Sequence, residues 1–163
     1  MIVEGRAVLI PGDDVDTDVM YPGRFLNVDD PEQMKEHLFE GYDPSLRDQL
    51  GNDAILVTGR NFGLGSSREH VVQALVAWGV QAVVGPSFAR IFRRNCANLG
   101  LAAVEAPEAA AAARPGSRIR IDTETGEIDV DGAPYDVPPT PPLVGELQQA
   151  GGLVAWTAQR VAR

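Results

Sequence analysis

The sequence predicts an α/β domain built on a parallel sheet, and the pattern of its middle third supports that fold class. Apolar runs of strand length alternate with amphipathic segments of helical length, at residues 54–58, 71–78, 81–85, 87–98 and 101–104. Both helical segments end at a glycine, Gly79 and Gly100, which is a common helix stop. Repeats of strand, helix and strand with helices of this length form parallel sheets with right-handed crossovers.

The N-terminal third is expected to add one strand and one helix. Residues 2–10 are typical of a strand, and an acidic loop follows from Gly12 to Asp18. We expect extended chain from Val19 to Val28. Asp30 has the features of a helix N-cap, with proline at the next position, so the sequence predicts a helix over 30–40.

The C-terminal third predicts further elements around the parallel core. Residues 117–121 and 127–131 flank a turn and predict a β-hairpin, and the alanine run 109–113 predicts a short helix. A proline-rich connection leads to two terminal helices, over 143–149 and 153–161, which Gly151 and Gly152 separate. With one sheet to bury, residues 1–163 are expected to form a single domain.

Composition excludes several classes of protein. A net charge of −9 argues against general binding of nucleic acid, which needs a basic surface. No apolar run approaches the roughly 18 residues that span a membrane, and residues 1–10 carry charges that do not suit a signal peptide. The single cysteine, Cys96, permits no internal disulfide, cannot hold an iron–sulfur cluster alone, and fits a cytoplasmic chain.

Charged residues are unevenly distributed along the chain. Aspartates gather early, whereas many arginines lie later, at Arg90, Arg93, Arg94, Arg114, Arg118 and Arg120. Such asymmetry is commonly no more than a solvated surface. A basic ridge of this kind could also contact an acidic partner.

The run from Asn61 to His70, Asn-Phe-Gly-Leu-Gly-Ser-Ser-Arg-Glu-His, carries the strongest chemical signal. It lies between a predicted strand and a predicted helix, at the carboxyl end of the strand, where α/β sheets place ligands. Ser66, Ser67 and Arg68 bring two hydroxyls and a guanidinium to free amide donors at a helix start, which indicates a carboxylate or phosphate site. The alternative for Ser66 is a helix N-cap, since Ser66 and Glu69 have capping-box spacing.

Nucleotide-binding and hydrolase motifs do not fit this run. A dinucleotide fingerprint would need glycine where Arg68 stands and an acidic residue between His70 and Val104, where there is none. A phosphate-binding P-loop would need a lysine, and the only lysine is Lys35. The serines also lack the Gly-x-Ser-x-Gly frame of a hydrolase.

The acidic loop offers a weaker signal. A calcium loop of the EF-hand kind needs glycine at its sixth position, where this chain has Asp18. We expect Asp16, Thr17 and Asp18 to rigidify the neighbouring site by accepting hydrogen bonds from arginines and backbone amides, with an ordinary surface loop as the alternative. Cys96 is expected to be a buried structural thiol.

Three segments together resemble a known family. They are the acidic loop from Gly12 to Asp18, the run from Asn61 to His70, and the run from Ser87 to Leu101, where Phe88, Ile91 and Phe92 would share one helix face. In order and spacing they are similar to small subunits of the isopropylmalate isomerase and homoaconitase group, which correspond to the swivelling fourth domain of aconitase. The resemblance extends over essentially the whole chain and implies an aconitase swivel-like fold.

The resemblance implies a role for each matching residue. Ser66 would be the general base that exchanges the carbon-bound proton of the substrate, with Asp18 as the active-site acid. Arg68 would bind a substrate carboxylate bidentately. Thr17 and Ser67 would add contacts to the substrate, and Gly65 and His70 would orient the loop. The family's [4Fe–4S] cluster would come from a separate large subunit, so this chain would bind no metal and be inactive alone.

The resemblance also bears on which hydroxy acid is the substrate. The arm of the substrate would be read by the segment Arg24 to Val28, with Arg24, Asn27 and Val28 as its contacts. Members that take tricarboxylates have arginine at the position of Asn27, so loss of that charge favours an uncharged arm, as in isopropylmalate. Arg24 could instead supply the charge, which leaves homoaconitate and citramalate-type or dimethylmalate-type acids as alternatives. A non-catalytic anion-binding module is the alternative of another class.

Overall fold

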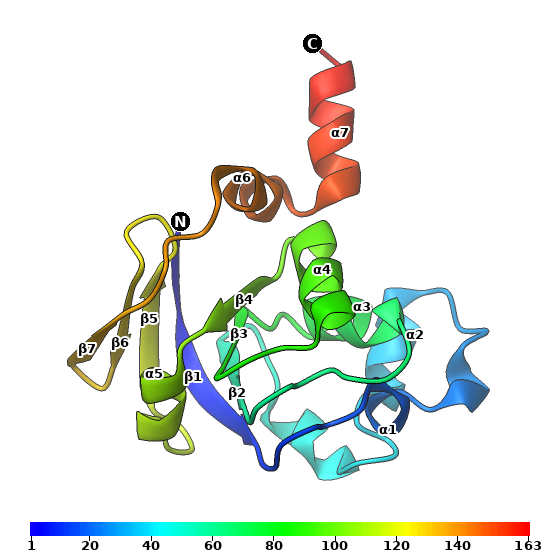
Figure 1. The fold of residues 1–163 in the computed structure, drawn as a ribbon. Helices are drawn as coiled ribbons and strands as arrows, with labels where there is room; N and C mark the ends of the chain where they lie inside the picture. The colour runs from blue at the N-terminus through cyan, green and yellow to red at the C-terminus, as the bar shows by residue number, and fades with distance from the viewer.

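The computed structural model describes residues 1–163 and contains one seven-stranded sheet (Figure 1). Its order is β4-β3-β2-β1-β5-β6-β7. Four neighbouring strands are parallel: β1 (Ile2–Ile10), β2 (Ala54–Thr58), β3 (Ala82–Gly85) and β4 (Ala102–Glu105). The other three are antiparallel: β5 (Arg118–Asp122), β6 (Glu127–Val130) and β7 (Ala133–Asp136). The predicted parallel core and hairpin are confirmed, whereas β7 was not predicted.

The helices connect and flank these strands. Two crossovers of the parallel part are α3 (Glu69–Ala77) and α4 (Arg90–Leu99). The remaining helices are α1 (Thr17–Met20), α2 (Pro31–Met34), α5 (Pro107–Ala112), α6 (Pro142–Ala150) and α7 (Leu153–Val161), with 3-10 turns at Gly23–Phe25, Lys35–His37 and Pro44–Gln49. The two predicted terminal helices and the short alanine helix are confirmed.

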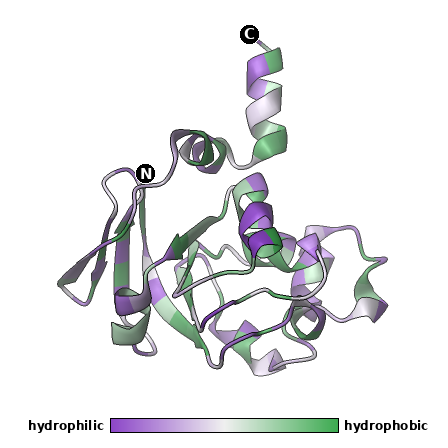
Figure 2. Ribbon diagram, viewed as in Figure 1, coloured by the Kyte–Doolittle hydropathy of each residue, from purple (hydrophilic) through white to green (hydrophobic).

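The sheet separates two hydrophobic cores. Alternate residues of β2 point into different clusters: Leu56 packs with Phe92 and other side chains under α3 and α4, and Ile55 packs with Ile121 on the opposite face. A strand buried on both faces explains why 54–58 is apolar without alternation. In Figure 2 the hydrophobic colour, green, appears along the parallel strands, whereas α4 carries both hydrophobic (green) and hydrophilic (purple) residues.

The C-terminal helices lie at one end of the molecule. Helix α6 packs beside α4, and α7 extends away from the body (Figure 1). Glu146 of α6 accepts hydrogen bonds from Trp156 Nε1 (3.0 Å) and Arg160 Nη2 (2.8 Å) of α7, which ties the two helices together. None of the helices is both long and apolar enough to span a membrane.

The region from Val19 to Glu40 differs from the prediction. The expected extended chain contains α1 and a 3-10 turn instead, because Asp16 Oδ1 accepts the Asp18 N–H (2.6 Å) and caps α1. The predicted helix over 30–40 is α-helical only to Met34, and its 3-10 continuation ends at His37. Phe39 takes a left-handed conformation (φ 63°), is buried, and donates its N–H to the Met20 carbonyl, so tertiary contacts override the helical pattern.

Helix α3 starts two residues before the predicted segment 71–78, whereas α4 starts three residues after the beginning of its predicted segment 87–98. Helix α3 starts at Glu69 and has no side-chain cap, so the capping-box interpretation of Ser66 is wrong. Helix α4 starts at Arg90 because the segment before it pairs with the Asn61–His70 run. Ile91 is 43% exposed whereas Phe88 and Phe92 are buried, so the prediction that the three share one helix face is also wrong. Gly100 ends α4 in the left-handed conformation, as expected.

Candidate active site

The three segments noted in the sequence meet at the carboxyl edge of the parallel strands. The run from Asn61 to His70, hereafter the motif loop, follows β2 and is hydrogen-bonded to the acidic loop after β1. Gly63 N–H donates to the Val15 carbonyl (2.9 Å), and Thr17 N–H donates to the Leu64 carbonyl (2.8 Å). Adjacent parallel strands thus bring together residues that are almost 50 positions apart in the sequence.

The motif loop is also fixed to the segment that precedes α4. Phe62 N–H donates to the Ser87 carbonyl (3.3 Å), and Ala89 N–H donates to the Phe62 carbonyl (2.9 Å). Gly63 has a positive φ of 85° and lies so close to the ring of Phe92 that an added Cβ would overlap it. The start of α4 therefore packs beneath and alongside the motif loop.

Ser66, Asp18 and Arg68 converge on one oxygen atom. The Ser66 hydroxyl donates to Asp18 Oδ1, and Arg68 Nε lies 3.1 Å from the same oxygen. Ser66 and Asp18 are exposed, while the Arg68 side chain is only 17% exposed. Thr17 Oγ1 donates to the Ser66 carbonyl (2.7 Å) and fixes the backbone of the serine. The cluster places a hydroxyl, a carboxylate and a guanidinium at one solvent-facing point.

The guanidinium of Arg68 is held by a backbone carbonyl and keeps N–H donors that have no partner within the chain. Its Nη1 donates to the Tyr21 carbonyl (2.7 Å), whereas Nη2 has no hydrogen-bond partner within the chain. A Cβ added at Gly23 would lie 3.4 Å from Nη2, so glycine leaves room beside the guanidinium. The group is oriented and retains N–H donors for an anion.

Two aromatic residues hold the predicted arm-reading segment against this cluster. The Tyr21 hydroxyl donates to the Phe25 carbonyl (2.9 Å), and His70 Nε2 lies 3.2 Å from the Leu26 carbonyl. The rings of Tyr21 and His70 stack with centroids 5.0 Å apart. His70 therefore joins the motif loop to the predicted arm-reading segment. Tyr21 was missed by the sequence reasoning, and only its partly buried contacts reveal its part in the site.

Arg24, which was predicted to contact the substrate arm, packs on an aromatic ring. Arg24 lies over the ring of Phe25 (4.6 Å from its centroid), and His37 stacks on the same ring with centroids 3.8 Å apart. The hydrogen bond from Arg47 lowers the pKa of Glu40 below its usual range, with smaller electrostatic contributions from Arg24 and His37. Arg24 thus lies over the ring of Phe25 and forms no ion pair with Glu40, which pairs with Arg47.

Three further predicted residues make few polar contacts. Asn27 is exposed, and its side chain makes no hydrogen bond within the chain. Val28 packs partly buried against the main core. The side chain of Ser67 is exposed and also has no hydrogen-bond partner in the chain. Gly65 adopts a positive φ of 99°, and an added Cβ there would overlap the carboxylate of Asp16.

The acidic loop is braced by its own carboxylates. Asp16 caps α1, and Asp13 accepts hydrogen bonds from the backbone N–H (2.8 Å) and Nη2 (3.1 Å) of Arg60. The backbone and side-chain hydrogen bonds from Arg60 lower the pKa of Asp13 below its usual value. Asp16 and Asp18 accept hydrogen bonds, in keeping with the expectation for this loop. Thr17 differs because it donates.

The chain offers no ligand set for a metal cluster. No group of three or more His, Cys, Asp or Glu side chains is placed to hold a metal ion. Cys96 is fully buried on the inner side of α4, and desolvation raises the pKa of its thiol well above the usual value. A buried, protonated thiol is unsuited to ligate iron, which takes the thiolate.

Comparison with known proteins identifies the family. Residues 19–109 match the family model of the aconitase C-terminal domain. A 3-isopropylmalate dehydratase small subunit of Moorella thermoacetica is 45% identical over 163 residues, which cover 99% of this chain and 98% of that protein. A protein of the same name from Thermodesulfovibrio yellowstonii is 42% identical over 153 residues, covering 93% and 91%.

Superposition on a solved structure supports the same family assignment. The crystal structure of 3-isopropylmalate dehydratase from Methanocaldococcus jannaschii superposes with a TM-score of 0.90 at 36% sequence identity, covering 99% of this chain and 96% of that one. The predicted aconitase swivel-like fold is thereby confirmed. The chain belongs to the family of 3-isopropylmalate dehydratase small subunits, which share the aconitase C-terminal domain.

Proposed function

We propose that the chain is the small subunit of a 3-isopropylmalate dehydratase, a hydro-lyase that interconverts 2- and 3-isopropylmalate in leucine biosynthesis. The observation that carries this proposal is the 45% identity to a protein of that name over nearly the full length of both chains. The cluster of Ser66, Asp18 and Arg68 supports it, because it brings a hydroxyl, a carboxylate and a guanidinium together at one solvent-facing point.

The proposal includes a larger partner subunit. The relatives are named as small subunits, and the open, solvent-facing cluster of this chain is suited to be covered by a second protein. We propose that this partner carries the [4Fe–4S] cluster, for which the present chain has no ligands. Such a cluster supplies a Lewis acid toward the leaving hydroxyl. A cytoplasmic location is part of the same proposal, supported by the unpaired thiol of Cys96.

Ser66 and Asp18 can move the proton of the reaction. Because the Ser66 hydroxyl directs its hydrogen to Asp18, a lone pair of Oγ is free to accept the carbon-bound proton of the substrate. As Oγ takes that proton, its own proton passes to the Asp18 carboxylate, and the C–H electron pair forms the double bond of the dehydrated intermediate as the C–O bond on the neighbouring carbon breaks and its hydroxyl leaves. The positive potential of Arg68 and of the α3 N-terminus stabilises the partial negative charge that develops on Oγ as its own proton moves toward Asp18.

Arg68 and Ser67 can hold a substrate carboxylate beside this proton path. The free Nη2 of Arg68 provides N–H donors in a plane fixed by Tyr21 and Asp18. The unpartnered hydroxyl of Ser67 adds a donor next to them. Thr17 acts through the backbone of Ser66, so we propose a positioning role for it rather than the direct substrate contact first expected.

The substrate arm is proposed to be uncharged. Asn27 is exposed on the arm-reading segment and carries no charge, and Val28 adds apolar surface beside it. Arg24, the only cation of this segment, stacks over the ring of Phe25, so pairing with a third carboxylate would require it to leave that ring. A carboxylate without a partner in a covered site is strongly disfavoured, which fits an isopropyl arm better than a tricarboxylate.

Turnover by the reconstituted enzyme tests the proposal. The chain would be mixed with its cognate large subunit, whose cluster is rebuilt without oxygen, and 3-isopropylmalate and a homocitrate-type acid would be offered separately. We expect turnover of isopropylmalate only by the mixture, with neither subunit active alone. Preference for the tricarboxylate would overturn the assignment of the arm, and turnover of neither by an intact complex would overturn the proposed reaction.

A further inference from the structure

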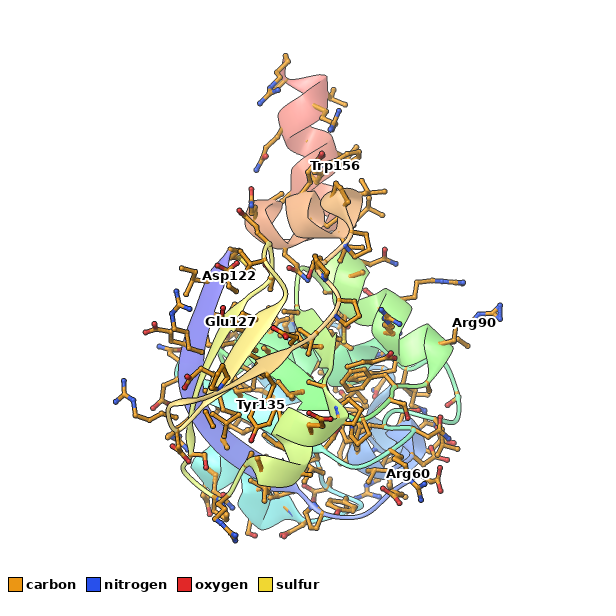
Figure 3. The ribbon with its side chains drawn as sticks, turned by 60° about the vertical axis from the view of Figure 1, so that its left-hand side comes forward. Arg60, Arg90, Asp122, Glu127, Tyr135 and Trp156 are labelled. Carbon is orange, nitrogen blue, oxygen red and sulfur yellow. The ribbon has the colours of Figure 1, made fainter.

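The outer face of α4 carries two exposed arginines and an exposed isoleucine. Phe92 points inward under Gly63, whereas Arg90, Ile91 and Arg94 are exposed on the other side of the same helix. Ile91, on the first turn of the helix, exposes an aliphatic side chain to solvent. Figure 3 shows Arg90 extending away from the body of the molecule. The helix that carries this α4 face, defined by Arg90, Ile91 and Arg94, packs against Phe62 and Gly63 of the motif loop through Ala89 and Phe92.

The two arginines of the α4 face lack counter-charges. Eight of the fourteen basic residues form an ion pair with a carboxylate. The six that do not are Arg24, Arg90, Arg94, Arg114, Arg118 and Arg163. Arg90 and Arg94 are the only two of these six in one helix, and they stand one turn apart. On a chain with a net charge of −9, two neighbouring free guanidiniums mark a locally basic surface.

The basic ridge expected from the sequence is divided in the structure. Arg93 pairs with Glu105 (3.3 Å), and Arg120 of β5 pairs with Glu4 (3.4 Å), away from the site. The α4 pair combines free charge with an adjacent exposed aliphatic side chain, on a helix whose start packs against the motif loop. Arginine next to apolar surface is the composition enriched in protein interfaces and in their strongest contacts.

We propose that the α4 face docks on an acidic, partly apolar patch of the large subunit beside the shared active site. This inference rests on the proposed function, because it takes the partner to be the subunit that completes the reaction. That partner has to cover the exposed Ser66 and Asp18, and a protein seated there reaches the α4 border of the same loop. Carboxylates on the partner would neutralise Arg90 and Arg94, and an apolar contact would cover Ile91.

Charge reversal on the α4 face tests the proposal. The variant Arg90→Glu/Arg94→Glu is compared with Arg118→Glu/Arg163→Glu, which changes net charge equally at two other exposed, unpaired arginines. Affinity for the cognate large subunit is measured at low and at high salt, and turnover is measured with the large subunit in excess. Arg90→Gln/Arg94→Gln serves as a milder variant, and the thermal midpoint of each variant checks its fold.

We expect the α4 reversal to weaken association at least tenfold at low salt, the Gln pair to weaken it less, and the control to change it less than twofold. Turnover at a saturating partner concentration should largely recover. Unchanged affinity in the α4 variants, or an equal loss in the control, would overturn the docking surface. If the wild-type pair binds through α4 but does not convert isopropylmalate, the proposed function fails while the docking surface stands.

Discussion

Arg68 and Tyr21 are joined by a 2.7 Å hydrogen bond from the guanidinium Nη1 to the tyrosine carbonyl oxygen. The hydroxyl of the same tyrosine donates to the Phe25 carbonyl, and its ring stacks against His70. One residue therefore links the arginine that is proposed to bind the substrate carboxylate to the segment that is proposed to read the substrate arm. A change in Tyr21 should alter substrate binding without altering the proton-transfer groups.

Tyr21→Phe should raise the KM for isopropylmalate several-fold and leave kcat nearly unchanged. The substitution removes the hydrogen bond that holds the Phe25 carbonyl, at a cost of about 1 kcal/mol in unfolding free energy. Tyr135→Phe is the matched control, because the Tyr135 hydroxyl has no partner in the chain. Steady-state kinetics with a saturating large subunit separate KM from kcat. A fall in kcat with KM unchanged would argue against this positioning role.

Gly65→Ala should reduce both stability and turnover. The residue has a φ of 99°, and a Cβ would overlap the Asp16 carboxylate that caps α1. We expect a loss of about 1–3 kcal/mol in the free energy of unfolding and a misplaced Ser66. Gly145→Ala in α6, where a Cβ meets open space, should be neutral or slightly stabilising. Urea unfolding of both variants measures the contrast, and equal effects would contradict it.

Sequence reasoning predicted most strands because their apolar runs are short and bounded by turns. It missed β7, where Ala133 to Asp136 has little β-propensity and pairs only through the hairpin geometry with β6. It also misjudged 19–40, since the left-handed Phe39 and the short α1 depend on contacts with distant segments. Patterns within a window of ten residues do not contain that information.

Within the site, the sequence identified the residues better than their contacts. Ser66 and Arg68 could be predicted because both belong to the motif run itself. Asp18 could be predicted because β1 and β2 are parallel neighbours, so the loops that follow them lie at the same edge of the sheet. The role of Tyr21 could not be predicted, since a lone buried aromatic residue has no pattern that distinguishes it from ordinary core. Neither could the exposure of Ile91, because helical periodicity does not say which of two neighbouring apolar positions faces the sheet.

Asn27→Arg should shift specificity toward a carboxylate arm. The new guanidinium would stand on the exposed arm-reading segment, where it could pair with a third carboxylate. We expect kcat/KM for isopropylmalate to fall about tenfold or more, and some turnover of a homocitrate-type acid to appear. Asn27→Gln, which adds length but no charge, is the control. If both variants keep the wild-type preference, this position does not read the arm.

Acidification should release the contact between Asp13 and Arg60. Hydrogen bonds from Arg60 lower the pKa of Asp13 in the folded protein, so the contact stabilises the fold above the unfolded pKa of about 3.9 and is lost as pH falls through the folded value. Asp13→Asn should therefore be less stable than wild type at pH 6, with the difference shrinking at pH 3. Urea unfolding at both pH values measures it, and Asp29→Asn controls for loss of an exposed charge. A difference that grows on acidification would contradict the assignment.

The most direct test of the account compares Ser66→Ala with Ser67→Ala in the complete two-subunit enzyme. The Ser66 hydroxyl is aligned on Asp18, whereas the Ser67 hydroxyl has no partner in the chain. With the large subunit saturating, Ser66→Ala should lower kcat for isopropylmalate by about 10²–10⁴-fold, and Ser67→Ala should mainly raise KM. A Ser66→Ala enzyme that retains full kcat would contradict the assignment of proton transfer to this chain.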